Sequence, residues 1–424
     1  MNILHINLAD EAGGAARAAL RLHTEFIRMG HSSRMLVGVQ RKHLPGIAMV
    51  PARQTSWQKT RFRLVNRFET ATGLQYLVQP WQNEFLRHPY TTEAQVINLH
   101  NLHSGYFPIR LLPRLSRSVP EVWMLHDLWA FTGHCGYPNL YGCERWKTGC
   151  GECPSLGDYP PLSRDTTAFL WRTKRRLYRR SAITLTTPSQ WLADAVRQSP
   201  LLGHCDVHCI PHGLDTAIYT PGPKLAAREK LGLPADAKIV LFSAFDAFLR
   251  RKGGVYLFEA LQRLHSEGMK DLLLVTVGQN QDTIGPKYGF PVRALGRIRD
   301  EQSMALCYSA ADIYVGPSLA ETFGLVFGEA MACATPVIAF AGTGASEVVR
   351  HMETGYLARF QDGEDLARGI RMFLEDADLR ETCGRRGREV AEQEYTLGLQ
   401  ARRLVALYEL VIAQRKAIHG DRSQ

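Results

Sequence analysis

Two carboxylates stand eight residues apart in the stretch of chain from 311 to 340. Glu321 lies in a turn that follows a short apolar run, and Glu329 lies inside an apolar, helix-like segment. In a helix they would be at most about 12 Å apart, close to the reach from a nucleotide's ribose to an attached sugar. Both could accept hydrogen bonds from hydroxyls. The alternative is a pair of structural carboxylates in a packed α/β core.

Backbone amides and basic side chains nearby could bind phosphate. Residues 322–325 open the apolar helix, and their amides could face a diphosphate with help from the helix dipole. The segment from Arg250 to Gly254 places Arg250, Arg251 and Lys252 in a loop that enters another helix. Cations at a helix N-terminus suit the same chemistry. A solvated basic turn is the alternative.

The first half of the chain offers a second group of candidate residues. His126 and Asp127 follow an apolar, strand-like run. An imidazole beside a carboxylate at a strand end can orient a ligand, accept a proton or stabilise charge. A histidine satisfied in the core is the alternative. Gly13 and Gly14 follow the first strand and would let the backbone approach a phosphate or sugar, or simply form a tight strand–helix turn.

Four cysteines lie within 19 residues and end in a C-x-x-C pair. Cys135, Cys143, Cys150 and Cys153 have spacings of seven, six and two intervening residues. This pattern suggests a thiolate cage for a structural Zn²⁺ ion. Disulfides, redox-active thiols and free thiols are the alternatives. The other five cysteines are expected to fill core positions.

Alternating strand and helix patterns would position these residues. In the first half, strand-like runs at 2–8, 33–39, 96–100, 121–125 and 182–187 alternate with helical segments. In the second half, runs at 239–244, 272–278, 313–315 and 336–340 do the same. This alternation predicts parallel sheets, in which ligands bind beyond the carboxyl ends of the strands. A length of 424 residues allows two or three domains.

Charge and hydropathy suggest the surroundings of the protein. The net charge is +10, and the first 190 residues hold twice as many basic as acidic residues. Segments 53–90 and 167–180 interleave cations with aromatic side chains, which suits an anionic membrane surface. Solvated helices packed on the sheet are the alternative. No nucleic-acid motif is present. No membrane span or signal peptide is evident, so we expect a cytoplasmic protein.

The carboxylate motif also resembles a known family signature. Glu321-x7-Glu329 lies within AETFGLVFGEAMACATPVIA and is followed by Gly342-Thr-Gly-Ala-Ser-Glu347 and Gly355. This combination resembles retaining GT-B glycosyltransferases of family 4. The resemblance implies two Rossmann-like α/β domains with parallel sheets facing across a cleft. It also implies that Glu321 contacts the donor sugar, that Glu329 contacts the ribose, and that no catalytic metal is needed.

The resemblance assigns further roles. Lys252-Gly253 matches a Lys-Gly pair of the family, and His126 matches a functional histidine. The family usually has an arginine five residues before the lysine. This chain has Ala247 there, so Arg250 or Arg251 would have to supply the second phosphate contact. The expected catalytic residues are His126 and Glu321, and the expected donor-binding residues are Gly13, Gly14, Arg251, Lys252, Thr322, Phe323, Gly324, Leu325 and Glu329.

The cysteine-rich segment narrows the resemblance to one group within this family. HDLWAFTGHC and CERWKTGCGECP resemble the group that includes the colanic-acid galactosyltransferase of capsule and exopolysaccharide synthesis. Such enzymes extend lipid-linked oligosaccharides on the inner face of the cytoplasmic membrane, so the resemblance implies a peripheral protein on that face. The resemblance implies three segments: an acceptor-binding domain at 1–215 with a Cys-rich insert at 134–154, a nucleotide-sugar-binding domain at 216–395, and a helix at 396–424 that crosses back to the first domain.

The candidate residues, together with the family that they resemble, predict a retaining hexosyltransferase. It would move a hexose from a UDP- or GDP-linked donor to a hydroxyl of a glycan or lipid-linked acceptor. Leaving-group stabilisation would come from cations and helix-terminal amides. The alternatives are a nucleotide-sugar epimerase or hydrolase on the same fold, and a non-catalytic basic binding module.

Overall fold

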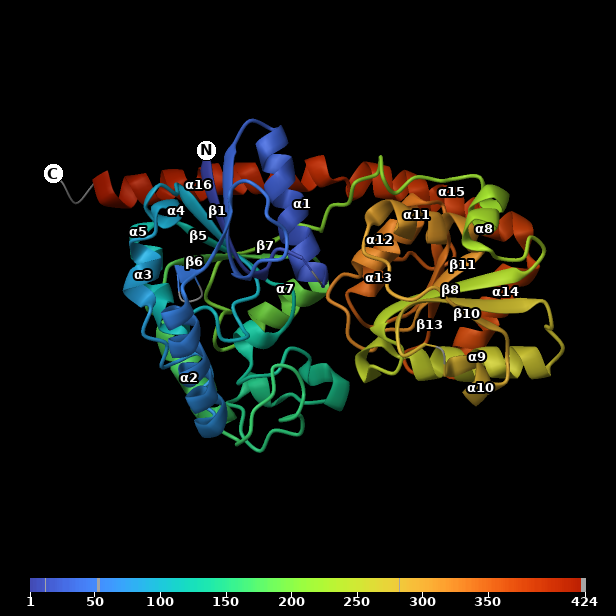
Figure 1. Cartoon of the computed structure of the whole chain (residues 1–424), viewed down its shortest axis with the longest axis horizontal. Coiled ribbons are helices and arrows are strands. Elements are labelled where there is room, and N and C mark those ends of the chain that lie inside the picture. Colours follow the sequence, from blue (N-terminus) through green and yellow to red (C-terminus); the bar gives the residue numbers. More distant parts are fainter. Residues whose placement is uncertain (12, 52–53, 282, 421–424) are drawn as a thin grey trace. The chain divides into compact units, whose positions relative to one another are not determined.

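The computed structural model describes residues 1–11, 13–51, 54–281 and 283–420. The chain divides into two compact units: Met1–Pro211 with Gln400–Gln424, and His212–Leu399. Each unit is built on a parallel β-sheet with helices packed against it (Figure 1). The last four residues of the predicted C-terminal helix lie outside the described residues, as does Arg53 of the predicted basic segment.

The sheet of the first unit has the order β3-β2-β1-β4-β5-β6-β7, and its pairings are parallel. Its central strands are buried apolar runs, as parallel sheets covered on both faces require. The strands predicted from the sequence are found here. Their bounds are β1 (Asn2–Ala9), β2 (Ser32–Val39), β3 (Ile47–Met49), β4 (Val96–Leu99), β5 (Glu121–Met124), β6 (Ile183–Thr187) and β7 (Val207–Cys209).

Helices cover this sheet, and local signals set some of their ends. Ser189 is the N-cap of α7, as predicted, and accepts a hydrogen bond from the Leu192 amide. Asn98 of β4 donates to the Tyr408 hydroxyl at 2.7 Å, which ties the last helix to the first unit. The helices are α1 (Gly14–Arg28), α2 (Ser56–Thr72), α3 (Gln82–Leu86), α4 (Pro89–Thr92), α5 (Leu112–Ser118), α6 (Thr167–Tyr178), α7 (Gln190–Arg197) and α16 (Leu397–Gly420).

The cysteine-rich segment between β5 and α6 contains only short 3-10 turns: η3 (Trp129–Phe131), η4 (Pro138–Tyr141) and η5 (Arg145–Lys147). Trp129, Phe131 and Trp146 nevertheless belong to the hydrophobic core of the first unit. These aromatic side chains therefore anchor a segment that has little regular backbone hydrogen bonding of its own.

The sheet of the second unit has the order β10-β9-β8-β11-β12-β13 and is also parallel. Strands β8 and β11 are neighbours although about 70 residues separate them, so the loops after them meet at one edge. The strands are β8 (Lys238–Asp246), β9 (Leu272–Gln279), β10 (Val292–Ala294), β11 (Ile313–Gly316), β12 (Val337–Phe340) and β13 (Gly355–Ala358).

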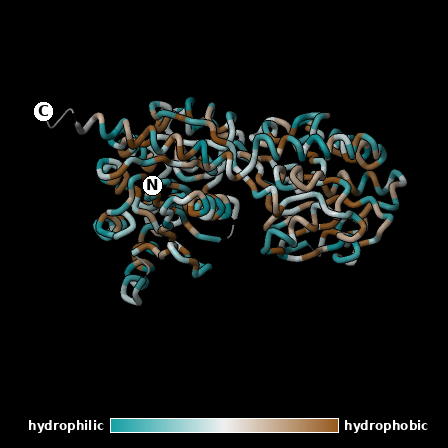
Figure 2. The backbone as a smooth tube through the Cα atoms, turned by 90° about the horizontal axis from the view of Figure 1, so that it is seen from above, coloured by the Kyte–Doolittle hydropathy of each residue, from teal (hydrophilic) through white to brown (hydrophobic). Residues whose placement is uncertain are grey.

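The helices of the second unit are mostly amphipathic, but α12 is buried along nearly its whole length. Figure 2 shows hydrophobic and hydrophilic residues alternating along many helices, as expected where one face covers a core. The helices are α8 (Lys224–Leu231), α9 (Gly254–Ser266), α10 (Ile284–Tyr288), α11 (Glu301–Ala310), α12 (Leu325–Ala332), α13 (Ala345–Val348), α14 (Gly363–Glu375) and α15 (Ala377–Glu394), with the short turn η6 (Arg250–Lys252) before α9.

Two expectations about basic segments need correction. Trp81 is fully buried and stacks on Phe62, so it cannot face a membrane. Lys174 of α6 is also buried, and its ammonium donates to the carbonyl oxygens of Trp129 and Thr132 at 2.7 and 3.1 Å. Within the described part of the chain, no helix is both long and apolar enough to cross a membrane.

Candidate active site

Glu321 and Lys252 form an ion pair at the carboxyl edge of the second sheet. Lys252 lies in η6, after β8, and Glu321 lies in the loop between β11 and α12. The Lys252 Nζ atom is 2.8 Å from Glu321 Oε2, and Arg251 Nη1 is 3.9 Å from the same oxygen. The sequence predicted each of these residues separately, and the structure brings them together.

A close backbone approach holds the two loops in place. The Leu319 amide donates to the Arg251 carbonyl at 2.8 Å. Gly253 has a φ of +64°, and a Cβ atom there would lie 1.9 Å from the Pro317 carbonyl oxygen. Only glycine fits at this position without movement of one loop, because the contact is with backbone and the φ angle is left-handed.

The cations keep Glu321 ionised. Burial alone would raise the pKa of this carboxyl, but the charges of Lys252 and Arg251, the Lys252 hydrogen bond and the Thr322 amide together hold it below its usual value. The Glu321 side chain is 15% exposed, so it is not fully closed off from solvent. A partly desolvated carboxylate flanked by two cations is suited to binding a polar ligand that carries both hydroxyl and phosphate groups.

Glu329 occupies a different environment from Glu321. It lies within α12 and is 1% exposed. The Tyr308 hydroxyl of α11 donates to its Oε2 atom at 3.2 Å. This contact agrees with the alternative in which Glu329 is a structural carboxylate that accepts a hydrogen bond from a buried tyrosine. Its expected role as a ribose ligand stays a prediction.

The residues between the two carboxylates contribute backbone more than side chains. The Phe323 ring packs in the core against His212 and Tyr395, so only its main chain can serve a ligand. Thr322 is also buried, and Leu325 is half-buried. Gly324 is the N-cap of α12 with a φ of +89°, and a Cβ there would strike the Phe327 ring. The first amides of α12 therefore start directly beside Glu321.

Ala247 stands where the family usually has an arginine, and a neighbouring arginine is placed to take over its role. The Ala247 side chain is fully buried and carries no charge, so it cannot supply the phosphate contact that the family's arginine would make. Arg250 is exposed, whereas Arg251 is half-buried and reaches towards Glu321. Arg251 is thus the better placed of the two arginines to complement Lys252.

His126 lies at the carboxyl end of β5 in the first unit and is half-buried. The expected pairing of His126 with Asp127 is not the hydrogen bond that forms. Asp127 Oδ2 is 3.1 Å from His103 Nε2, and Asp127 Oδ1 accepts from the Trp129 amide at 2.9 Å. His126 Nε2 is instead 3.0 Å from His100 Nδ1. Asp127 still interacts with His126 electrostatically.

The contacts of Asp127 keep it ionised. Burial would raise the pKa of this carboxyl, but the charge and hydrogen bond of His103 and the Trp129 amide hold it below its usual value. His103 is itself buried, and its Nδ1 atom is 3.0 Å from the Ser104 hydroxyl oxygen. Neither His103 nor His100 is among the site residues predicted from the sequence. Their signal was the repeated histidine after the β4 strand, in NLHNLH.

Gly13 and Gly14 lie where the sequence predicts, between β1 and α1. Gly13 is the N-cap of α1 with a φ of +90°, and both glycines are exposed. A Cβ at Gly13 would meet no atom within 4 Å, so its backbone angle and not packing is what favours glycine. Within the first unit, both glycines are exposed at the surface.

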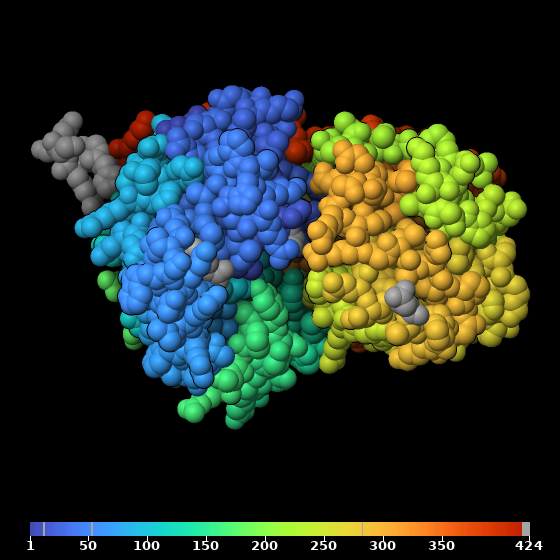
Figure 3. Space-filling model, in the orientation of Figure 1, coloured from blue at the N-terminus to red at the C-terminus, as the bar shows by residue number. Residues whose placement is uncertain are grey.

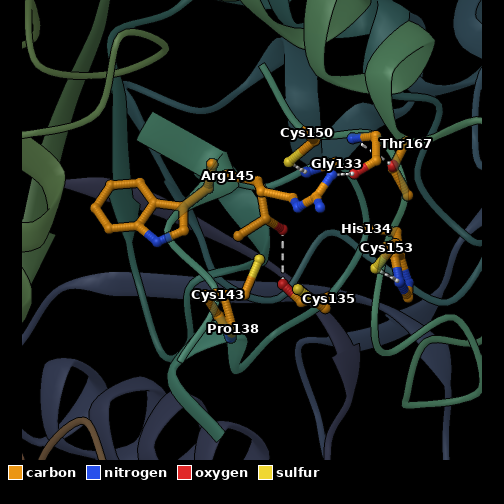
Figure 4. A pocket seen from close by; sticks show the side chains of 12 residues that line it. Gly133, His134, Cys135, Pro138, Cys143, Arg145, Cys150, Cys153 and Thr167 are labelled. Atoms are coloured by element: carbon orange, nitrogen blue, oxygen red, sulfur yellow. Dashed lines mark hydrogen bonds between the residues drawn. The ribbon is translucent and has the colours of Figure 1, made fainter. Parts of the chain in front are cut away.

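All four cysteines of the C-x-x-C segment line one small cavity of about 10 Å³ (Figure 4). His134 lines it too, with its Nε2 atom 3.4 Å from Cys153 Sγ. Burial raises the pKa of the Cys135 thiol to about 12 and of the Cys150 thiol to about 11. Across the described ranges, no three His, Cys, Asp or Glu side chains form a group that could hold a metal ion. The zinc site stays a prediction.

Comparisons with known proteins identify the family and the fold. The model of the family "Glycosyltransferase Family 4" matches residues 12–218, and the model "Glycosyl transferases group 1" matches residues 223–390. The two models together span most of the chain, one in each unit. The chain therefore belongs to the glycosyltransferases that combine these two domains.

Among curated proteins, the chain is similar to the putative colanic acid biosynthesis glycosyl transferase WcaC of Escherichia coli K12. The two are 29% identical over 371 residues, which cover 82% of this chain and 85% of that protein. It is also 32% identical to the D-inositol 3-phosphate glycosyltransferase of Stackebrandtia nassauensis, over 56% of this chain and 55% of that protein. The expected family and group are thereby confirmed.

Solved structures show the same architecture. Sucrose-phosphate synthase from Thermosynechococcus elongatus aligns with a TM-score of 0.69 at 22% identity, over 98% of this chain and 100% of that one. Anabaena HepE in complex with UDP-glucose aligns with a TM-score of 0.67 at 18% identity, over 96% and 99%. These likenesses show that the fold is the GT-B fold. The protein is a glycosyltransferase, similar to WcaC along most of its length.

Proposed function

We propose that this protein moves a hexose, with retention of the anomeric configuration, from a nucleotide-sugar to a hydroxyl of a lipid-linked oligosaccharide or polysaccharide acceptor. The observation that carries the proposal is the ion pair of Lys252 and Glu321 beside Arg251 and the start of α12. Cations and amides gathered at one sheet edge suit a diphosphate, and the carboxylate suits sugar hydroxyls. The similarity to WcaC supports a role in cell-surface polysaccharide synthesis.

The donor would bind to the second unit. Arg251 and Lys252 would contact the diphosphate oxygens, and the first amides of α12 would add partial positive charge. These groups would stabilise the negative charge that develops on the nucleoside diphosphate as the glycosidic bond breaks. Glu321 would accept hydrogen bonds from the hexose, and Glu329, which already accepts from the Tyr308 hydroxyl, would accept from the ribose.

The HepE structures contain UDP and UDP-glucose, which supports a UDP-linked donor over a GDP-linked one. The acceptor would bind to the first unit near Gly13, Gly14 and His126. Both glycines are exposed, and His126 is accessible at the carboxyl end of β5. His126 would contact the reacting sugars through its imidazole.

The enzyme would work on the cytoplasmic face of the membrane, where α2 supplies a docking surface. Trp57, Leu64 and Phe68 are 71%, 64% and 52% exposed and lie seven and four residues apart, on one face of the helix. Exposed Arg63 and Arg67 lie beside this stripe. Figure 3 shows α2 at the surface of the first unit, in light blue. An apolar stripe with flanking cations suits an anionic lipid surface.

The four cysteines would hold a structural zinc ion. The turn around Cys150 has left-handed φ angles, and the Gly133 amide donates to Cys150 Sγ at 3.2 Å. His134 Nδ1 donates to the Pro160 carbonyl at 2.9 Å, which leaves Nε2 unprotonated beside Cys153. Burial lowers the pKa of Lys174 to about 7, and thiolate charge on Cys150 and Cys135 would favour its ammonium form. The thiols would have to rotate inward, because no three potential ligands in the described chain converge.

An acceptor-dependent transfer assay tests the proposal. Purified protein would be incubated with labelled UDP- and GDP-hexoses and with membrane extracts that contain lipid-linked oligosaccharides. We expect label to enter the lipid fraction only when acceptor is present, with one nucleotide preferred. Release of free sugar without acceptor would favour the hydrolase alternative. Absence of both reactions, together with no thermal stabilisation by any nucleotide, would contradict the proposal.

A further inference from the structure

Three histidines form a hydrogen-bonded row across neighbouring strands of the first sheet. His5 lies in β1, His100 follows β4 and His126 follows β5, and these strands are adjacent in the order β1-β4-β5. His5 Nδ1 is 3.1 Å from His100 Nε2, and His100 Nδ1 is 3.0 Å from His126 Nε2. Consecutive rings stack with centroids 5.4 and 5.3 Å apart. The row leads from the core of the first unit to His126.

The inner end of the row is closed. His5 is fully buried, and its ring stacks on Phe26 of α1 at 5.7 Å. Its second ring nitrogen, Nε2, has no hydrogen-bond partner among the described residues. Burial, helped by the nearby His23, lowers the pKa of His5 to about 3. At neutral pH this ring is therefore uncharged and carries one N–H group.

The position of that N–H sets the direction of the whole row. If His5 carried its proton on Nε2, a buried N–H would have no acceptor. If the proton is on Nδ1, only a lone pair is left without a partner, which is the less costly arrangement. His5 Nδ1–H then donates to His100 Nε2. A neutral His100 must carry its own proton on Nδ1 and donate it to His126 Nε2.

We propose that this row holds His126 as the Nδ1–H tautomer, with His100 and His5 as positioning residues. Because Nε2 of His126 is occupied as an acceptor, Nδ1 is the nitrogen that carries the proton. His126 then carries its N–H group on Nδ1 at the carboxyl end of β5, and it cannot act as a base through that nitrogen while neutral. The tautomer follows from the row alone.

The use of this tautomer rests on the proposed function. In a sugar transferase, a fixed N–H donor at a strand end would bind an oxygen of the reacting sugar or of the phosphate. The row would preset the orientation of that donor before a ligand arrives, because the His126 ring is held by both the hydrogen bond and the stacking contact with His100.

Nuclear magnetic resonance on the full chain tests the tautomer directly. Protein labelled with ¹⁵N in its histidine rings would be recorded at neutral pH, and His126→Gln would identify the His126 signals. We expect a protonated Nδ1 and an unprotonated Nε2 for His126 in the unaltered chain. A protonated Nε2, or fast averaging between the two tautomers, would overturn the proposal without the need for any core variant.

His100→Phe tests whether the row is the cause. It keeps a planar ring in the stack but removes the donor to His126 Nε2, so we expect His126 to populate both tautomers. The control His208→Gln alters an imidazole of β7, outside the row, and should leave the His126 signals unchanged. A single Nδ1–H tautomer in His100→Phe would show that the row does not set it.

Activity measurements test whether the Nδ1–H group of His126 serves as a donor in the reaction, separately from whether that tautomer is present. An asparagine amide nitrogen can occupy the place of Nδ1, whereas that of glutamine reaches the place of Nε2. We expect His126→Asn to keep at least tenfold more kcat than His126→Gln. Equal losses in the two variants would overturn the donor role while the resonance result decides the tautomer. Absence of transfer by the unaltered enzyme would instead count against the proposed function.

Discussion

Lys252 Nζ lies 2.8 Å from Glu321 Oε2, although 69 residues separate the two along the chain. The contact forms because β8 and β11 are neighbours in a parallel sheet, so the loops that follow them share one edge. The cations hold the Glu321 carboxylate ionised while leaving it partly open to solvent. A phosphate of the donor would compete with Glu321 for Lys252. Phosphate binding would therefore release Glu321 to bind the sugar.

Removal of the Lys252 charge should abolish most activity. We expect Lys252→Ala to lower kcat by about 100- to 1,000-fold, the cost of losing one group that stabilises developing charge. Glu321→Gln should lower kcat comparably with little change in unfolding temperature. The control is Lys238→Ala, which breaks the 3.0 Å pair with Asp271 at the start of β8. Steady-state kinetics that show full activity in Lys252→Ala would contradict the assignment.

The contact between Gly253 and the Pro317 carbonyl predicts a sharp effect of a single methyl group. Gly253→Ala should lower the free energy of unfolding by more than the about 1–2 kcal/mol of left-handed strain, because its Cβ also meets backbone at 1.9 Å. Gly268→Ala is the matched control, since Gly268 has a φ of +109° and open space. Urea denaturation compares the two. Equal losses would mean that the loops separate freely.

Buried histidines should make stability depend on pH. Burial lowers the pKa of His5 to about 3 and of His23 to about 4, below the ordinary value of 6.5. The unfolded chain therefore binds more protons, and stability is lost as pH falls from about 6.5 towards 4, by at most about 1.4 kcal/mol per unit for each histidine. Chemical denaturation at several pH values measures this slope.

Two variants, His5→Phe and Phe26→Leu, test whether His5 contributes to the loss of stability at acid pH. His5→Phe should flatten the slope, because one titrating group is removed. Phe26→Leu should lower stability by a similar amount at every pH, because the ring it shortens packs on His5 but does not titrate. An unchanged slope in His5→Phe would show that His5 does not contribute.

The exposed stripe on α2 predicts membrane binding. Combined Trp57→Ser, Leu64→Ser and Phe68→Ser should weaken binding to vesicles of phosphatidylglycerol by at least about tenfold, because apolar burial and cationic attraction act together. Binding of the unaltered protein should also fall with added salt. Leu225→Ser alters an exposed leucine of α8 and serves as control. Equal sedimentation of all proteins with vesicles would contradict this surface.

The thiol cavity predicts one zinc ion per chain. Inductively coupled plasma mass spectrometry should find a zinc-to-protein ratio near one after purification without chelator, and Cys150→Ser should reduce it. The variant should also unfold at a lower temperature, because the segment between β5 and α6 has little regular structure. Cys209→Ser, an exposed cysteine of β7, is the control. Zinc-free protein that unfolds at the same temperature would exclude the site.

The sequence by itself determined the local elements and the edge where ligands would bind. Alternating apolar runs predicted the strands of both units, and Ser189 predicted a helix N-cap that the structure contains. These features depend on short-range periodicity and backbone geometry, which a single stretch of chain already expresses.

Only the tertiary structure decided which side chains meet. The sequence placed His126 beside Asp127, yet His126 bonds to His100 and Asp127 bonds to His103, because β4 and β5 are neighbours in the sheet and the segments that follow them share one edge. Trp57 and Trp81 lie in the same basic and aromatic segment, but one is exposed and the other fully buried. Such partners follow from strand order and helix packing, which are set by contacts between distant parts of the chain.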